Sequence, residues 1–122
     1  SFNTPPVYPI YVAMLTFRWI KARGGVVAME QHNKAKAKLL YDEIERNPKF
    51  KCTVEDPGSR SLMNVTFAPV DESDTGPFLV ACEAAGCVGV KGHRSVGGFR
   101  ASIYNSMPVE SVQALVDVLQ AF

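Results

Sequence analysis

Apolar residues along the first third of the chain recur with the spacing of helices. Between residues 8 and 22 they occur on every side of the predicted helix, which is typical of a helix buried all round. A glycine pair at 24–25 breaks this pattern. A second helix is then predicted, because apolar residues in 26–44 recur three or four apart with charged residues between them. This second helix is amphipathic and should bury one face.

The rest of the chain alternates between strand and helix patterns. Short strands are expected at 51–55, 61–67, 87–90 and 98–104, and helices at 74–85 and 108–121. The order is therefore ααββαββα, in which strands pair locally and helices are left to cover one face of the sheet. We expect a single α+β domain over residues 1–122, an α/β sandwich with a small antiparallel or mixed sheet of about four strands backed by helices.

The last predicted strand carries chemistry on one of its faces. Alternate residues from Phe99 onward are apolar and should join the core, which directs Arg100 to the opposite face. His93 and Arg94 lie in the glycine-rich loop just before this strand. Arginine offers a planar fork of donors that matches carboxylate or phosphate, and glycine lets the backbone approach a ligand closely. The stretch predicts an anion site.

Simpler interpretations of the same polar residues stay open at this stage. Arg100 alone would be a solvated surface charge and His93 an exposed loop residue. Lysines 34, 36 and 38 wind around the second helix, and solvation or a pair such as Lys38–Asp42 explains Lys34 and Lys38. Asn3 and Thr4 predict, by themselves, only a capping turn before the first helix.

Composition and charge limit the kinds of ligand and partner that we expect for this chain. The chain has 122 residues, of which 47% are hydrophobic and 20% charged, as in an ordinary globular protein. A net charge of +1 provides no broad basic surface, so we expect a small ligand and no nucleic acid. The apolar opening contains three prolines and is followed by basic residues at 18, 21 and 23, which leaves too short a run to cross a bilayer. No membrane partner is expected.

Three cysteines, at 52, 82 and 87, form no C-x-x-C pair. This pattern argues against a disulfide framework and against a metal site, and indicates idle thiols in a reducing, cytoplasmic compartment. The chain also opens without methionine on a loop-like segment. We interpret this start as a cut in a longer protein.

Five motifs occur together in this chain in the order of a known family. They are NTPP at the start, the glycine pair before the second helix, KAKLLY, RSLMNVTF and GHRSVGGFRASIYNSMP. Together they resemble the C-terminal part of the phosphoserine aminotransferases, pyridoxal-phosphate enzymes of the class V aminotransferases. The match runs over nearly the whole chain. It implies the C-terminal small domain of a fold-type I enzyme, with residues 1–22 leading in from a large domain.

The resemblance also implies a role for each candidate residue. Arg100 would grip the substrate's carboxylate, and His93 and Arg94 would lie near its distal phosphate or carboxylate. Asn3 and Thr4 would reach across a homodimer interface to the phosphate of the pyridoxal phosphate in the second subunit. Under this resemblance Asn3 and Thr4 are more than a capping turn. The all-apolar first helix would be covered by the large domain or by the partner subunit.

The reaction implied by the resemblance is a step of serine biosynthesis. Glutamate gives its amino group to 3-phosphohydroxypyruvate, which yields phosphoserine and 2-oxoglutarate, with pyridoxal phosphate as electron sink. A related phosphorylated substrate of vitamin B6 (pyridoxine) biosynthesis stays an open question. The family's Schiff-base lysine belongs to the large domain, and none of the lysines at 34, 36, 38, 49, 51 and 91 stands in its context. The chain alone should hold no catalytic residue and be inactive.

A second interpretation is a free-standing, small-anion-binding or regulatory α+β module without catalysis. Asn3 and Thr4 would have no use in such a module, which favours the aminotransferase. The intact mass of the protein from its natural source separates the two, because only the enzyme requires a much longer chain.

Overall fold

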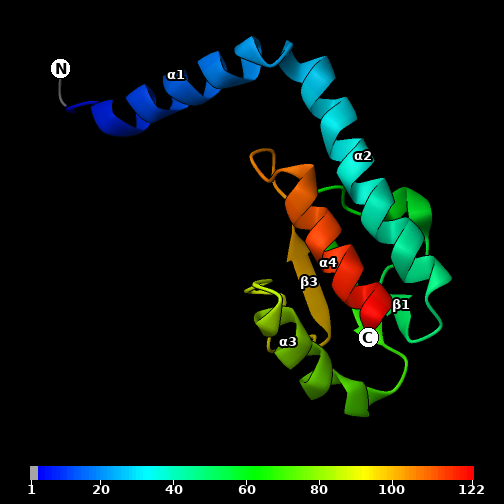
Figure 1. Ribbon diagram of the computed structural model, residues 1–122. Coiled ribbons are helices and arrows are strands. Elements are labelled where there is room, and N and C mark those ends of the chain that lie inside the picture. The colour runs from blue at the N-terminus through cyan, green and yellow to red at the C-terminus, as the bar shows by residue number, and fades with distance from the viewer. Residues whose placement is uncertain (1–2) are drawn as a thin grey trace. The chain divides into compact units, whose positions relative to one another are not determined.

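The computed structural model describes residues 3–122, which fall into two compact units, one ending at His32 and one running from Asn33 to Phe122. The helices are α1 (Val7–Ala22), α2 (Gly25–Arg46), α3 (Thr75–Ala84) and α4 (Val109–Ala121), and the strands are β1 (Phe50–Cys52), β2 (Asn64–Pro69) and β3 (Phe99–Ser102) (Figure 1). Two short 3-10 helices, Pro57–Ser59 and Glu72–Asp74, complete the elements.

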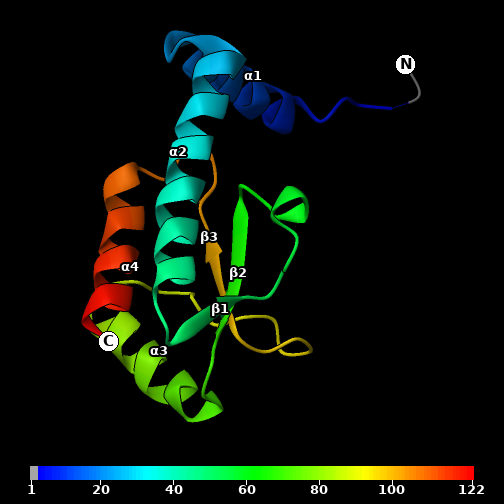
Figure 2. The same cartoon turned by 90° about the vertical axis from the view of Figure 1, so that its right-hand side faces the viewer.

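The sheet of the second unit is antiparallel, with the strand order β1-β2-β3. Its register sets Phe67 opposite Phe99 and Val65 opposite Ala101. The part of α2 in this unit lies with α3 and α4 on one side of the sheet, and the other side carries no α-helix of this unit (Figure 2). We call this other side the helix-free face. The expected α+β class with locally paired strands is confirmed.

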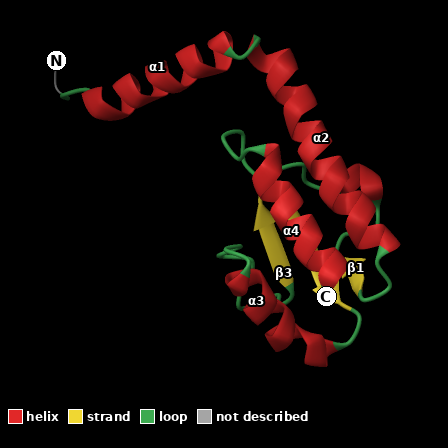
Figure 3. Ribbon diagram, viewed as in Figure 1, coloured by secondary structure: helices red, strands yellow, loops and turns green. Residues whose placement is uncertain are grey.

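The strand expected at 87–90 is not formed, so the sheet has three regular strands in the described chain. Figure 3 draws most of the segment between α3 and β3 as loop. One isolated bridge joins Lys91 to Phe99, and the Arg100 N–H donates to the Val90 carbonyl at 2.7 Å. Gly89 has a φ of +75°, which turns the backbone away from the extended form. The segment therefore touches the edge of β3 without becoming a fourth strand.

The core lies between the sheet and its helices. Along β2 and β3 every second side chain is buried, as the alternation of apolar residues predicts. Four phenylalanine rings meet in the middle of this core, with adjacent centroids 4.7–6.4 Å apart: Phe50, Phe67, Phe78 and Phe99. This packing fixes β3 from the side of the sheet that the helices cover. The polar residues of the strand therefore lie on the helix-free face.

The lysines of helix α2 differ in their burial. Its apolar stripe is buried from Met29 to Ile44, although Val26 is 77% exposed. Lys38 pairs with Asp42 at 2.5 Å on the surface, as expected. Lys36 does not lie on the surface with it, because its side chain is completely buried. It follows Asn33 by three positions and precedes Leu40 by four, so it belongs to the buried stripe.

No residue of α1 is buried. Seven large apolar side chains between residues 7 and 17 are each at least 42% exposed: Val7, Tyr8, Ile10, Tyr11, Val12, Leu15 and Phe17. The expectation that this domain alone would leave much of the helix uncovered is confirmed. Across residues 3–122, no helix combines the length and the hydropathy needed to span a membrane.

The three cysteines are free thiols, as their spacing indicates. Burial raises the pKa of Cys82 to about 11 and also raises the pKa values of Cys52 and Cys87. All three are therefore protonated near neutral pH and are poor nucleophiles. Within residues 3–122 no group of histidine, cysteine or carboxylate side chains is arranged to hold a metal ion.

Candidate functional site

Arg100 projects from β3 on the helix-free face of the sheet. Its neighbours in the strand, Phe99 and Ala101, are buried, whereas Arg100 is exposed. It stands opposite Thr66 of β2. Among residues 3–122 its guanidinium makes no hydrogen bond and no ion pair, although its backbone is held on both sides. The fork is therefore available to a ligand from a rigid base.

The strand residues that share this face are all polar except Ala68, and none of them is a carboxylate. They are Lys51, Asn64, Thr66, Ala68, Arg100 and Ser102. The Ser102 hydroxyl donates to Asn64 Oδ1 at 3.1 Å, and the Tyr104 hydroxyl donates to the same oxygen at 3.3 Å. The neutral groups thus satisfy one another, while the strand cations on this face are Lys51 and Arg100. Such a surface attracts an anion.

The loop before β3 is closed at its base beside Arg100. The Gly92 N–H donates to the Gly98 carbonyl at 2.9 Å, and the N–H groups of Val96 and Gly97 both donate to the His93 carbonyl, at 2.9 and 2.8 Å. Gly98 has a φ of +61° and passes so close to β2 that a Cβ there would lie 2.7 Å from the Phe67 carbonyl oxygen. Glycine is required for this approach.

His93 and Arg94 are exposed at the outer part of this loop. His93 Nδ1 lies 2.7 Å from the Ser95 hydroxyl, which orients the imidazole. In the described part of the chain no hydrogen bond or ion pair joins these two side chains to Arg100. The loop base makes the connection instead, through the Val90 carbonyl and the Arg100 N–H. The structure brings the three residues onto neighbouring segments without direct pairing.

Asn3 and Thr4 belong to the other compact unit and immediately precede the segment that enters α1. Both are exposed. Their expected contact with the cofactor of a second subunit stays a prediction.

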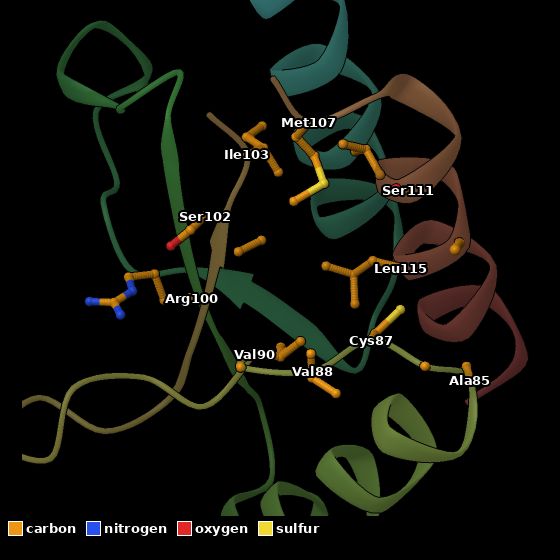
Figure 4. Close-up of a pocket in the computed structure, with 15 residues that line it drawn as sticks. Ala85, Cys87, Val88, Val90, Arg100, Ser102, Ile103, Met107, Ser111 and Leu115 are labelled. Atoms are coloured by element: carbon orange, nitrogen blue, oxygen red, sulfur yellow. The ribbon is translucent and has the colours of Figure 1, made fainter. Parts of the chain in front are cut away.

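A cavity of about 320 Å³ lies on the other side of β3 from the Arg100 fork. In Figure 4 Met107 and Leu115 border it, while Arg100 and Ser102 project away from its centre. Its other lining residues are mostly apolar and come from 85–90, from α4, and from Ala101 and Ile103 in and just after β3. The Arg100 guanidinium thus points away from this cavity, although Arg100 is one of its lining residues.

Sequence reasoning missed one buried polar junction beside the site. Lys36 and Asn33 of α2 contact the segment that follows β3, where Asn105 accepts a hydrogen bond from the Asn33 amide at 2.7 Å. The signal was present, because both residues occupy the buried stripe of α2. A charged residue in such a stripe is rare unless it has buried partners.

Replacing Gly98 with alanine should lower the free energy of unfolding by about 2 kcal/mol, because alanine is strained at positive φ and its Cβ would collide with backbone. Urea denaturation of the chain measures the effect. Gly76→Ala is the matched control, since a Cβ there meets nothing within 4 Å and alanine favours the helix. Equal stability of the two variants would contradict the strained approach at Gly98.

Comparisons with known proteins agree on one family. The model of "Aminotransferase class-V" matches residues 1–115. Phosphoserine aminotransferase of Phocaeicola vulgatus is 57% identical, over 99% of this chain and 35% of its own length. The solved phosphoserine aminotransferase from Bacillus circulans subsp. alkalophilus has a TM-score of 0.92 and 45% identity, over 98% of this chain and 33% of that one.

A pyridoxal-phosphate-bound phosphoserine aminotransferase from Trichomonas vaginalis has a TM-score of 0.88 and 42% identity, over 98% of this chain and 34% of that one. The chain thus spans about a third of the length of the curated relatives it matches.

Proposed function

Because the chain belongs to the class V aminotransferase family, we propose that it is the C-terminal domain of a phosphoserine aminotransferase and supplies half of the substrate site. The complete protein transfers the amino group of glutamate to 3-phosphohydroxypyruvate. Phosphoserine and 2-oxoglutarate are the products. The observation that carries the proposal is the exposed Arg100 fork, held on a rigid strand beside a glycine-closed loop.

Arg100 binds the carboxylate that both amino acids and oxo acids carry next to the reacting carbon. Two parallel N–H groups of its guanidinium fit the two carboxylate oxygens, which orients the substrate as well as binding it. His93 and Arg94 receive the far end, where one substrate carries a phosphate and the other a carboxylate. The loop that carries them has room to adjust, because only its base is tied to the sheet.

The residues present fit one end of pyridoxal phosphate. Asn3 and Thr4 offer an amide N–H and a hydroxyl from an exposed segment, which is a donor set suited to phosphate. They would hold the cofactor phosphate of a second subunit in a homodimer. When bound, the cofactor supplies the electron sink for amino-group transfer. This chain contributes substrate binding and orientation to that chemistry.

A homodimer also explains the uncovered first helix. The apolar side chains of α1 that this chain leaves exposed would be covered by the remainder of the protein and by the partner subunit. The three cysteines are free thiols, as is usual for proteins of the reducing cytoplasm, so we place the protein in that compartment.

The proposed function is tested with the full-length protein and the 122-residue chain side by side. With pyridoxal phosphate, glutamate and 3-phosphohydroxypyruvate, the full-length protein should form phosphoserine. The chain alone should form none, and borohydride reduction followed by mass mapping should find no single lysine carrying the cofactor, because the lysine that the family uses lies outside this chain. Turnover by the chain alone, with one stoichiometrically modified lysine, would contradict this division of roles. A full-length protein without transaminase activity would refute the function itself.

A further inference from the structure

The buried side chain of Lys36 uses all of its donors on one short segment. Its Nζ donates to the carbonyl oxygens of Ile103, Tyr104 and Met107, at 3.1, 2.6 and 3.0 Å. An ammonium group has three N–H donors, so each one is satisfied by a main-chain oxygen. The three oxygens converge on one point only if the segment 103–107 keeps its present shape.

Burying a lysine completely costs free energy, because its ammonium group loses its contact with water. Within residues 3–122 Lys36 forms no ion pair, and its exposed fraction is 0%. Burial lowers the pKa of Lys36, which reflects the cost of removing an ammonium group from water. Methionine would fill a similar volume without that cost. The lysine is therefore better explained by the geometry it imposes than by packing.

The segment that Lys36 holds is the direct continuation of β3. Ile103 follows the strand and donates its N–H to the Met63 carbonyl at 2.8 Å, and the Met107 N–H closes a turn onto the Tyr104 carbonyl at 2.9 Å. One turn earlier on α2, Asn33 donates to Asn105 at 2.7 Å. Asn33 and Lys36 of α2 thus hold the segment that follows β3 in place.

The opposite end of β3 is fastened by the glycine-closed loop. Arg100 lies between these two anchors, on a strand that pairs with β2 along its length and meets residues 90 and 91 only through Phe99 and Arg100. We propose that Lys36 is a positioning residue of the carboxylate site: by fixing the exit of β3 it sets the direction in which Arg100 presents its guanidinium. This inference rests on the proposed role of Arg100.

The test uses the full-length protein with its cofactor and an unreactive five-carbon dicarboxylate, glutarate, as probe. Lys36→Met is compared with Lys38→Met, the matched control on the exposed side of the same helix. Isothermal titration calorimetry should show the dissociation constant of glutarate rising about tenfold or more in Lys36→Met, as expected when a binding fork is misaligned. Lys38→Met should stay near the wild-type value. An unchanged constant in folded Lys36→Met would overturn the inference.

A double-mutant cycle separates positioning from general damage. In an Arg100→Lys background the fork is absent, so Lys36→Met should weaken glutarate binding little further. Full additivity of the two changes would overturn the inference, because Lys36 would then act independently of Arg100. If Arg100→Lys itself leaves glutarate binding unchanged, the proposed function fails and the inference with it. If only Lys36→Met is without effect, the function stands and the inference alone fails.

Circular dichroism and the thermal midpoint report folding in parallel. Should Lys36→Met not fold, Lys36→Gln replaces it, since the amide keeps two donors without the charge. A folded Lys36→Gln with weakened glutarate binding would support the inference. Failure of both variants to fold would make Lys36 a requirement of the fold and would overturn the positioning role.

Discussion

Arg100→Lys in the full-length protein should lower catalytic efficiency at least tenfold. Lysine keeps the charge but removes the planar fork, so one of two parallel hydrogen bonds to the carboxylate is lost. A hydrogen bond to a charged group is worth about 1.5–3 kcal/mol, which corresponds to a factor of about 10 to 150 in kcat/KM. The structure supports this size of effect, because Arg100 has no partner among residues 3–122 that could compensate.

Steady-state kinetics with glutamate and with the phosphorylated substrate measure the loss. Both substrates should be affected, since both present a carboxylate at the same point. Arg46→Lys is the matched control, because Arg46 is a mostly exposed arginine of α2 that pairs with Glu43 away from the helix-free face. Unchanged kinetics of the Arg100 variant, or an equal loss in the control, would refute the assignment.

The 122-residue chain by itself should self-associate through α1. Full burial of one large apolar side chain is worth about 1.5–3 kcal/mol, and seven such side chains are exposed on this helix. Covering a good part of them approaches the free energy of about 8 kcal/mol that a micromolar dissociation constant represents. Size-exclusion chromatography with light scattering measures the mass, and hydrogen exchange over residues 7–22 should show protection that rises with concentration.

Two charged substitutions localise the contact. Ile10→Glu combined with Phe17→Glu should restore the monomer, because it places carboxylates within the apolar surface. Val96→Glu is the control, since Val96 is 79% exposed but lies in the other compact unit. A strictly monomeric chain whose first helix exchanges as slowly as its sheet would contradict the prediction. It would also weaken the case that a larger protein covers this helix.

The alternation of apolar residues was sufficient to predict which way Arg100 points. A strand has a period of two, so once Phe99 and Ala101 are assigned to the core, Arg100 must face away from it. The same local rules predicted the four helices, the amphipathic stripe of α2 and the Lys38–Asp42 pair. These features depend on residues that are neighbours along the chain, so composition and spacing determine them.

Tertiary structure alone decided the features that depend on residues far apart. The segment 87–90 has strand-like residues, yet it forms no strand, because the backbone turns at Gly89 and only Val90 and Lys91 reach the edge of β3. The local pattern did not distinguish Lys36 from the other lysines of its helix, yet three carbonyls more than sixty residues away bury it. The energy of a buried charge depends on partners that only the folded chain brings together.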